Sequence, residues 1–439
     1  MKLPSNLSSP NLKLGLPSTK LKLSAPSFKA PSLGRRAGAD VVGLDIQPGF
    51  VAAVKARANG SIVAERAISV PLAADVMRDG EVLDEAALTS ALRELFADAK
   101  LGKRVRIGVA NQRTVLRTLE LPPVTDQKEL AAAVSFQAQD QVPMPLGNAV
   151  LDFHPLGIVE TPSGPRQRVV LVAAQRDMVE RLLNAVRGAG LTAAGVDLSA
   201  FALIRSLYRH EADQTGRVLY LNVDGLSNLA IAEGTVCRFT RVVGSGLEGM
   251  AVELAERRGI ALVDARARLL EADLTTPPLP EPRAAEAVAE EAPAVEPESE
   301  SDGEAALLSP AEAEAREREM SFEELSAVGA LQDQEPGETP AASDADVWTV
   351  LDNGVREISG EVRNSLDFHR SQDGGGEVSH VVLSGAAQDI PGFAEALQGS
   401  LGVEVRPTTI GITEGGLEGD VSTHRLAVAA GLAASEIHQ

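Results

Sequence analysis

The stretch that decides the fold is DVVGLDIQPGFVAAVKARANGSIVAERAISV (residues 40–70), because the chain contains a second version of it. The first version runs through an apolar strand, an acidic turn at Asp45 and two further strands joined by a short turn. The second version, RVLYLNVDGLSNLAIAEGTVCRFTRVV (residues 217–243), repeats this order with its acidic turn at Asp224. Two copies of a three-stranded meander, each followed by a helical pattern, predict an α/β protein with a duplicated lobe.

Between the two copies, residues 111–190 form a predicted α+β module inserted into the first lobe. Its first helical pattern follows Asp126, a residue type that caps helix N-termini. The apolar face of that helix is expected to comprise Leu130, Val134 and Ala138. Its second helical pattern, centred on Leu182, is expected to close the module.

Charge is distributed unevenly over the 439 residues, whose formal net charge is −21. Residues 271–346 hold 22 acidic residues against three arginines, whereas residues 1–38 hold seven basic residues and no acid. Both segments are rich in residues that do not build a core, so we expect a disordered basic tail and a disordered acidic insert. The first lobe is then expected at 39–215, and the second at 216–270 and 347–439.

Several classes of function lack support in the sequence. A basic groove interleaved with aromatic residues, as in proteins that bind nucleic acids, does not occur. The six histidines are scattered without metal-ligand spacing, and the single cysteine, Cys237, lies in an apolar run typical of core. No apolar run reaches the length of a membrane span. We therefore expect a cytoplasmic protein, peripheral to a membrane at most.

A glycine motif, Gly244-x-Gly246-x-x-Gly249, follows the second meander and precedes a helical pattern. In a dinucleotide-binding fold these glycines would join the first strand and helix of a parallel βαβ unit. Here the preceding strand closes a meander, and the following residues continue as helix. We favour a sharp strand-to-helix turn facing a cleft, with a dinucleotide-dependent enzyme as the alternative.

Five stretches together resemble the PilM family, the actin-like proteins of type IV pilus assembly, which are related to FtsA. They are VVGLDIQPGFVAAV, LRTLELPPVTDQKELAAAVSFQAQDQVPMPL, VVLVAAQRDMVERLLNAVRGAGL, RVVGSGLEGMAVELAERRGI and VVLSGAAQDIPGFAEAL. The second of these is the most specific, because it marks the inserted module. The resemblance covers about residues 41–270 and 347–435.

The resemblance implies a bilobed actin-like fold, built from duplicated RNase H-like lobes, with ATP and Mg²⁺ in the cleft between them. It also implies a partner, the cytoplasmic tail of a PilN-like inner-membrane protein, bound in a groove beside residues 111–190. Such a protein would link the pilus motor to the membrane alignment complex, support twitching motility and lie peripherally at the inner membrane. Homo-oligomers are compatible with this, and an FtsA-like filament tethered by the basic tail is a further alternative.

The resemblance also assigns three loops to the cleft. The first phosphate loop is Asp45 to Phe50, the second is Asn222 to Asn228, and the adenosine loop is Ser384 to Gln388. The implied catalytic residues are Asp45 and Asp224, with Asp45 also the candidate ligand of Mg²⁺. The implied nucleotide contacts are Gln47, Gly49, Asn222, Gly225, Gly244, Gly246, Gly385 and Ala386.

The phosphate loops depart from the family pattern. Gln47 and Pro48 stand where Gly and Ser are usual, and Pro48 has no N–H to offer a phosphate. Ala52 occupies the expected position of a lysine, Asn222 that of an aspartate, and Ala386 that of a glycine. Since phosphoryl transfer depends on positioning and charge compensation, we expect a scaffold with weak or absent hydrolysis.

Overall fold

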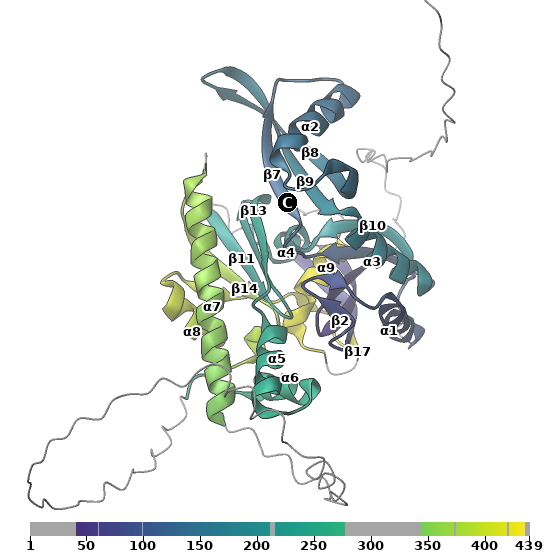
Figure 1. Cartoon of the computed structure of the whole chain (residues 1–439), viewed down its shortest axis with the longest axis vertical. Helices are drawn as coiled ribbons and strands as arrows, with labels where there is room; N and C mark the ends of the chain where they lie inside the picture. Colours follow the sequence, from purple (N-terminus) through teal and green to yellow (C-terminus); the bar gives the residue numbers. More distant parts are fainter. Residues whose placement is uncertain are drawn as a thin grey trace, which may run out of the picture. The chain divides into compact units, whose positions relative to one another are not determined.

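The computed structural model describes residues 41–434 except 60, 99, 211–215, 277–343, 373–374 and 419–420. The predicted tail and residues 277–343 of the predicted insert therefore lie outside the described residues. The two ends of that predicted insert are helical, because one helix ends at Glu271 and the next begins at Asp344. Everything described belongs to one compact unit built around three main sheets (Figure 1).

The first lobe is built on a seven-stranded sheet in the order β10-β6-β1-β2-β3-β16, with β17 also paired to β3. The strands are β1 (Val42–Gln47), β2 (Phe50–Asn59), β3 (Ser61–Pro71), β6 (Arg104–Val109), β10 (Thr192–Leu198), β16 (Gly411–Ile412) and β17 (Leu417–Glu418). The predicted first meander is confirmed, since β1, β2 and β3 pair antiparallel in sequence order. Helices α1 (Glu85–Asp98) and α3 (Arg176–Gly188) cover one face, next to a small hairpin of β4 (Met77–Arg78) and β5 (Glu81–Val82).

The second lobe repeats this plan with a five-stranded sheet in the order β13-β12-β11-β14-β15. The strands are β11 (Arg217–Val223), β12 (Ser227–Glu233), β13 (Val236–Val243), β14 (Val378–Ser384) and β15 (Val405–Pro407). One face packs against α5 (Leu247–Arg258), α6 (Leu262–Glu271), α7 (Asp344–Ser371) and α8 (Phe393–Leu401). The second predicted meander is therefore confirmed.

Two short helices, α4 (Ser199–Leu207) and α9 (Ala427–Ala433), lie between the sheets and share a core with both. Helix α9 consists of small residues and packs very closely: a Cβ placed on Gly43 would lie 1.8 Å from the carbonyl oxygen of Ala429. A Cβ on Gly431 would likewise lie 1.9 Å from the carbonyl oxygen of Ala202 in α4. Glycine at these two positions lets backbone meet backbone.

The C-terminal segment differs from the prediction, which assigned all of residues 347–439 to the second lobe. Strands β16 and β17 pair with β3, and α9 packs on β1, so residues 411–434 join the first lobe. The reason is the small-residue surface of α9, which fits the Gly43 position of β1. The chain thus returns to its first sheet after completing the second.

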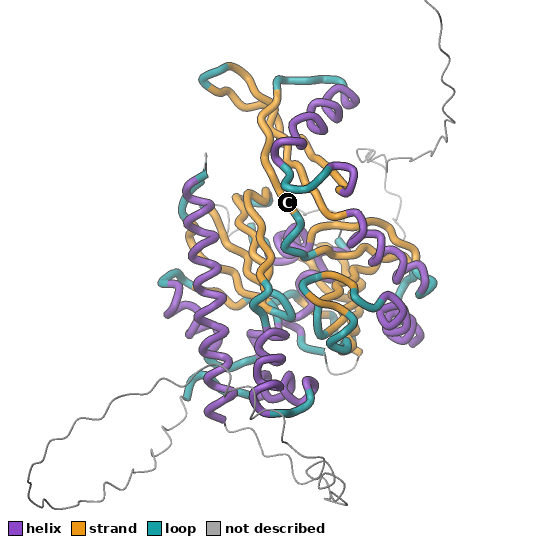
Figure 2. Tube along the Cα trace, in the orientation of Figure 1, coloured by secondary structure: helices purple, strands orange, loops and turns teal. Residues whose placement is uncertain are grey.

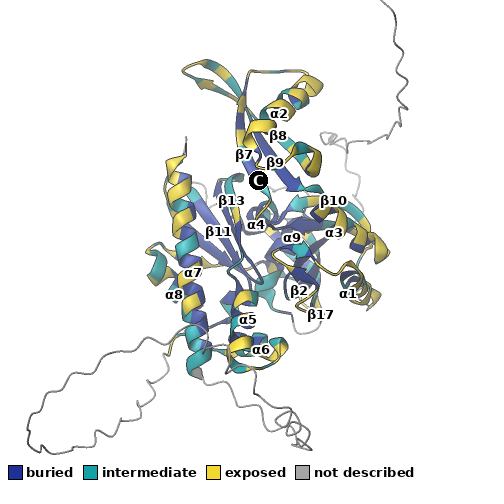
Figure 3. Cartoon of the chain, in the orientation of Figure 1, coloured by how far each residue is buried: buried dark blue, intermediate teal, exposed yellow. Residues whose placement is uncertain are grey.

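The inserted module is a separate three-stranded sheet in the order β7-β9-β8 with its own core (Figure 2). It comprises β7 (Val115–Leu121), α2 (Gln127–Gln141), the 3₁₀ turn η1 (Leu146–Asn148), β8 (Ala149–Thr161) and β9 (Gly164–Gln175). Asp126 caps α2 as predicted, accepting from the backbone N–H groups of Lys128 and Glu129. The outer surface of α2 is largely exposed (Figure 3).

Helix α3 was expected to close this module but belongs to the first lobe instead. Leu182 and Val186 are buried against Leu88 and Leu92 of α1, in the core beneath the first sheet. The module therefore ends with β9, at Gln175.

Candidate functional site

The first phosphate loop ends strand β1 with a buried carboxylate. Asp45 is 1% exposed, and its Oδ2 accepts a hydrogen bond of 3.0 Å from Nε2 of Gln47, which is also buried. Gly49 follows at φ +90°, a conformation that favours glycine, and completes the turn into β2. Gln47 thus orients Asp45, and both side chains face inward.

The second loop holds a more extensively bonded carboxylate. Asp224 is fully buried, and its Oδ1 accepts from the backbone N–H of Ala386 at 2.9 Å. Its Oδ2 accepts from Nδ2 of Asn222 at 3.2 Å, while Asn222 Oδ1 accepts from the hydroxyl of Ser384 at 2.7 Å. The predicted second phosphate loop and the predicted adenosine loop are therefore joined through Asp224.

Burial dominates the electrostatics of both acids. Burial first, and then the negative charge of Asp224, raise the pKa of Asp45 to about 7, while the Gln47 hydrogen bond opposes the shift. Burial also raises the pKa of Asp224, opposed first by the positive charge of Arg425 and then by the Ala386 N–H. The carboxyl group of Asp45 is thus the one whose charge the protein compensates least.

The loops of the two lobes touch each other directly. A Cβ placed on Gly225 would lie 2.1 Å from the carbonyl oxygen of Pro48 in the first loop. A Cβ on Gly246 would lie 2.5 Å from the carbonyl oxygen of Gly225, and one on Gly385 would lie 2.2 Å from that of Val223. The predicted glycines therefore meet protein backbone in this arrangement.

A charged pair of the second lobe lies at the same junction and bonds the first lobe. Arg266 of α6 pairs with Glu248 of α5, donating from Nε at 2.8 Å, and its Nη1 donates at 3.0 Å to the carbonyl oxygen of Leu72 in the first lobe. A Cβ on Gly49 would lie 2.8 Å from Oε2 of Glu248. Neither residue of this pair was predicted, because helical Glu and Arg side chains usually lie on solvated faces.

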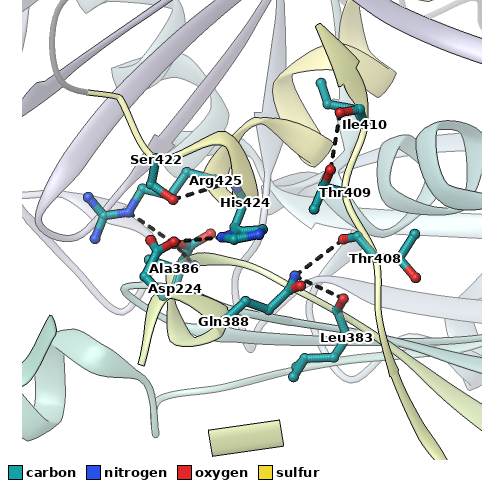
Figure 4. A network of polar contacts seen from close by, with 11 residues as sticks. Asp224, Leu383, Ala386, Gln388, Thr408, Thr409, Ile410, Ser422, His424 and Arg425 are labelled. Atoms are coloured by element: carbon teal, nitrogen blue, oxygen red, sulfur yellow. Dashed lines mark hydrogen bonds and ion pairs between the residues drawn. The ribbon is translucent and has the colours of Figure 1, made fainter. Parts of the chain in front are cut away.

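The third contribution comes from the turn η4 (Thr423–Leu426), which precedes α9 (Figure 4). Arg425 donates from Nε to Oδ1 of Asp224 at 3.2 Å, and its guanidinium lies 4.8 Å from the ring centroid of Phe50. His424 pairs with Asp389 at 2.6 Å. Sequence reasoning missed Arg425, since nothing local relates it to an aspartate 201 positions earlier.

The glycine motif does not form a dinucleotide site. Strand β13, which precedes it, is an edge strand antiparallel to β12, and α5 is followed directly by α6, so a parallel βαβ unit is not formed. Gly246 belongs to the loop contacts above. Gly244 lies elsewhere, where a Cβ would come within 3.3 Å of Nε2 of Gln112.

The residues present do not fit a magnesium–triphosphate group in this arrangement. Pro48 offers a carbonyl to Gly225 where a phosphate would need an N–H. Ala52, at the expected lysine position, is buried in the sheet, and Arg425 already pairs with Asp224. The N–H of Ala386 is likewise taken by Asp224.

The remaining candidates behave as core. Cys237 is buried, its thiol contacts the carbonyl oxygen of Phe239, and burial raises its pKa to about 12. Tyr220 is fully buried. Among the described residues, His, Cys, Asp and Glu side chains form no cluster that could hold a metal ion, and no helix is both long and apolar enough to cross a membrane.

A small cavity of about 10 Å³ with a mixed polar and apolar lining lies where the inserted module meets both lobes. Its lining residues are Val109, Asn111, Thr114, Leu198, Ala200, Asn228, Thr240, Arg241 and Val242. Thr114 Oγ1 and Asn228 Oδ1 are buried and have no hydrogen-bond partner among the described residues. Buried polar atoms are normally paired, so two unpaired atoms at one cavity require an explanation.

Comparisons with known proteins agree with this architecture. Residues 43–218 match the family model described as type IV pilus assembly protein PilM. A solved PilM-PilN type IV pilus biogenesis complex aligns with a TM-score of 0.64 and 21% identity, covering 90% of this chain and 98% of that one.

Two other solved structures align less closely. The ethanolamine utilization protein EutJ from Carboxydothermus hydrogenoformans has 14% identity and a TM-score of 0.43, covering 90% of this chain and 88% of its own. MreB 5 of Spiroplasma citri, bound to AMPPNP, has 12% identity and a TM-score of 0.42, and the alignment covers 89% of this chain and 94% of that one. The match over 43–218 and the alignment over 90% of the chain show that this protein is similar to PilM and has an actin-like fold.

Proposed function

We propose that this protein is a cytoplasmic scaffold of type IV pilus assembly that holds the cytoplasmic tail of a PilN-like inner-membrane protein. The family match and the alignment to a PilM-PilN complex support the pathway and the class of partner. The observation that carries the location of the site is the pair of unpaired buried polar atoms at the small cavity beside the inserted module.

The cavity has room for about one water-sized group, so a tail lying over it could place a single polar group there. The hydroxyl of Thr114 can donate or accept, and the side-chain amide of Asn228 offers both a donor and an acceptor, so either could bond such a group. Thr114 lies just before β7, beside β13, whose Arg241 is at the rim and pairs with Glu361. A bound tail would thus contact the inserted module and the second lobe together.

The test is calorimetric titration of the full chain with a synthetic peptide of the PilN-like partner's cytoplasmic tail. Thr114→Val removes one unpaired hydroxyl without changing the side chain's shape, so folding should be unaffected. Loss of a single neutral hydrogen bond should weaken peptide binding by about fivefold, corresponding to about 1 kcal/mol. Thr118→Val, at an exposed position of β7, is the matched control and should bind normally.

Two results would contradict the proposal. If titration with the tail peptide gives no binding heat, the proposed PilN-like partner is wrong. If the peptide binds Thr114→Val as strongly as wild type, the cavity is not the binding site. The wider role, which connects the pilus motor and the alignment complex at the inner membrane and supports twitching motility, depends on the first result. Homo-oligomers and an FtsA-like filament stay predictions.

We further propose that ATP hydrolysis is weak or absent. Support comes from the phosphate loops, where Pro48 lacks an N–H and Ala52 replaces the expected lysine. A purified chain that hydrolysed ATP at ordinary ATPase rates, with the activity abolished in Asp45→Ala, would contradict this part alone.

A further inference from the structure

Two acidic side chains are buried in the cleft between the lobes. Asp45 and Asp224 are both buried, and the negative charge of Asp224 disfavours the charge of Asp45. In a buried site, a carboxylate without a counter-charge is strongly destabilising. Something must therefore compensate at least one of these charges when the lobes are together.

Arg425 is placed to do this from outside both loops. It comes from η4, which leads into α9 and so belongs to the segment packed on the first lobe. Its Nε bonds Asp224 of the second lobe at 3.2 Å, while its guanidinium lies against the ring of Phe50, the residue that begins β2. One side chain thus contacts both lobes at their junction.

The turn that carries Arg425 is itself attached to the second lobe. The backbone N–H of Gly385 donates at 3.1 Å to the carbonyl oxygen of His424, and the ring of His424 pairs with Asp389. Ser422 stabilises the turn by accepting from the N–H of His424. Figure 4 shows His424 and Arg425 of this turn beside Asp224 and Ala386 of the second lobe.

We infer that Arg425 is a built-in counter-cation for the cleft, so that η4 holds the two lobes together without a bound nucleotide and metal. The contacts between Pro48 and Gly225 and the Arg266–Glu248 pair complete the junction once the charge of Asp224 is balanced. The inference is independent of the tail-binding proposal, because it concerns only what sets the arrangement of the lobes.

The experiment compares single and double variants of Arg425 and Asp224 in the full chain. Arg425→Ala should lower the melting temperature and accelerate hydrogen exchange in residues 222–228 by about tenfold, because it leaves Asp224 buried and unpaired. Adding Asp224→Asn to that variant should restore most of the loss, since the uncompensated charge is gone. Arg370→Ala, which removes an exposed helix-surface pair with Asp367, should change neither quantity.

The second part of the experiment measures nucleotide binding. In the wild-type chain, ATP with Mg²⁺ should produce no saturable shift of the melting temperature and no protection of residues 45–50 from exchange. A saturable shift would overturn the inference. So would an Arg425→Ala defect that Asp224→Asn leaves unchanged, because the arginine would then act through packing alone. If Arg425→Ala does not fold, recovery of the folded chain in the double variant supports the inference and failure to recover contradicts it.

Discussion

The perturbation most closely tied to the cleft is Asp45→Asn, because its effect should depend on pH in a defined direction. Asparagine has nearly the same shape, keeps an oxygen that can accept from Gln47 and cannot ionise. In the folded wild-type chain the pKa of Asp45 is about 7, against an ordinary value of 3.8. Between these values the folded chain holds a proton that the unfolded chain has released, so wild-type stability falls as pH rises through this window.

The magnitude follows from the same two pKa values. Each pH unit well inside the window costs the folded wild-type chain about 1.4 kcal/mol, and the slope decreases near the folded pKa. Between about pH 5 and pH 7 the free energy of unfolding should therefore fall by about 2 kcal/mol because of this group. The loss should level off above the folded pKa. The Asn variant lacks this dependence, so its stability relative to wild type should rise by the same amount.

The assay is urea unfolding of both chains at four pH values from about 5 to 8, above the sequence pI of about 4.8. Asp75→Asn removes an exposed carboxylate as a control, and its stability difference from wild type should show no comparable slope. A difference between Asp45→Asn and wild type that is constant with pH would refute the reasoning, since it would mean that Asp45 is ionised in the folded chain throughout.

Three other predictions concern packing and reactivity. Gly43→Ala should destabilise the chain by roughly 3 kcal/mol or more in thermal unfolding, because its Cβ would collide with the backbone of Ala429. Gly360→Ala in α7, where a Cβ meets nothing within 4 Å, should instead stabilise the chain by about 0.5–1 kcal/mol. Arg106→Ala should cost about 2 kcal/mol by the same measurement, because Arg106 donates to two carbonyl oxygens at the C-terminal end of α9. Cys237 should resist a thiol reagent at about pH 8 in the folded chain and react promptly in denaturant, and fast native reaction would contradict its buried environment.

Local patterns were sufficient for the strands and most helices, because strand pairing inside a meander is decided by neighbouring segments. Both meanders and the Asp126 cap follow from residue alternation and capping. The choice of packing partner is different, because an apolar helix face does not specify which core it joins. The prediction therefore wrongly assigned Leu182 of α3 to the core of the inserted module, and α9 to the second lobe.

The candidate site shows the same division. Family resemblance located the loops that meet, and the structure brings together Asp45, Asp224, Gly225, Gly246 and Ala386 through direct contacts or charge. The resemblance could not supply Arg425, because the ion pair with Asp224 depends on how the C-terminal turn returns to the cleft. A long-range ion pair of this kind leaves no periodicity or spacing in the sequence.

Glycines in these loops have two distinct physical explanations, and the structure distinguishes between them. A glycine that cradles a phosphate leaves its N–H free to point at the ligand, whereas a glycine at a backbone crossing is required because a Cβ would collide. Gly225 and Gly246 are of the second kind, since each faces a carbonyl oxygen of another loop at 2.1 Å and 2.5 Å from the Cβ position. Close contact between loops therefore explains both glycines, across the lobes at Gly225 and within the second lobe at Gly246, and their presence does not indicate nucleotide binding. The informative position is Pro48, where the closed junction needs only a carbonyl oxygen and a phosphate would need an N–H.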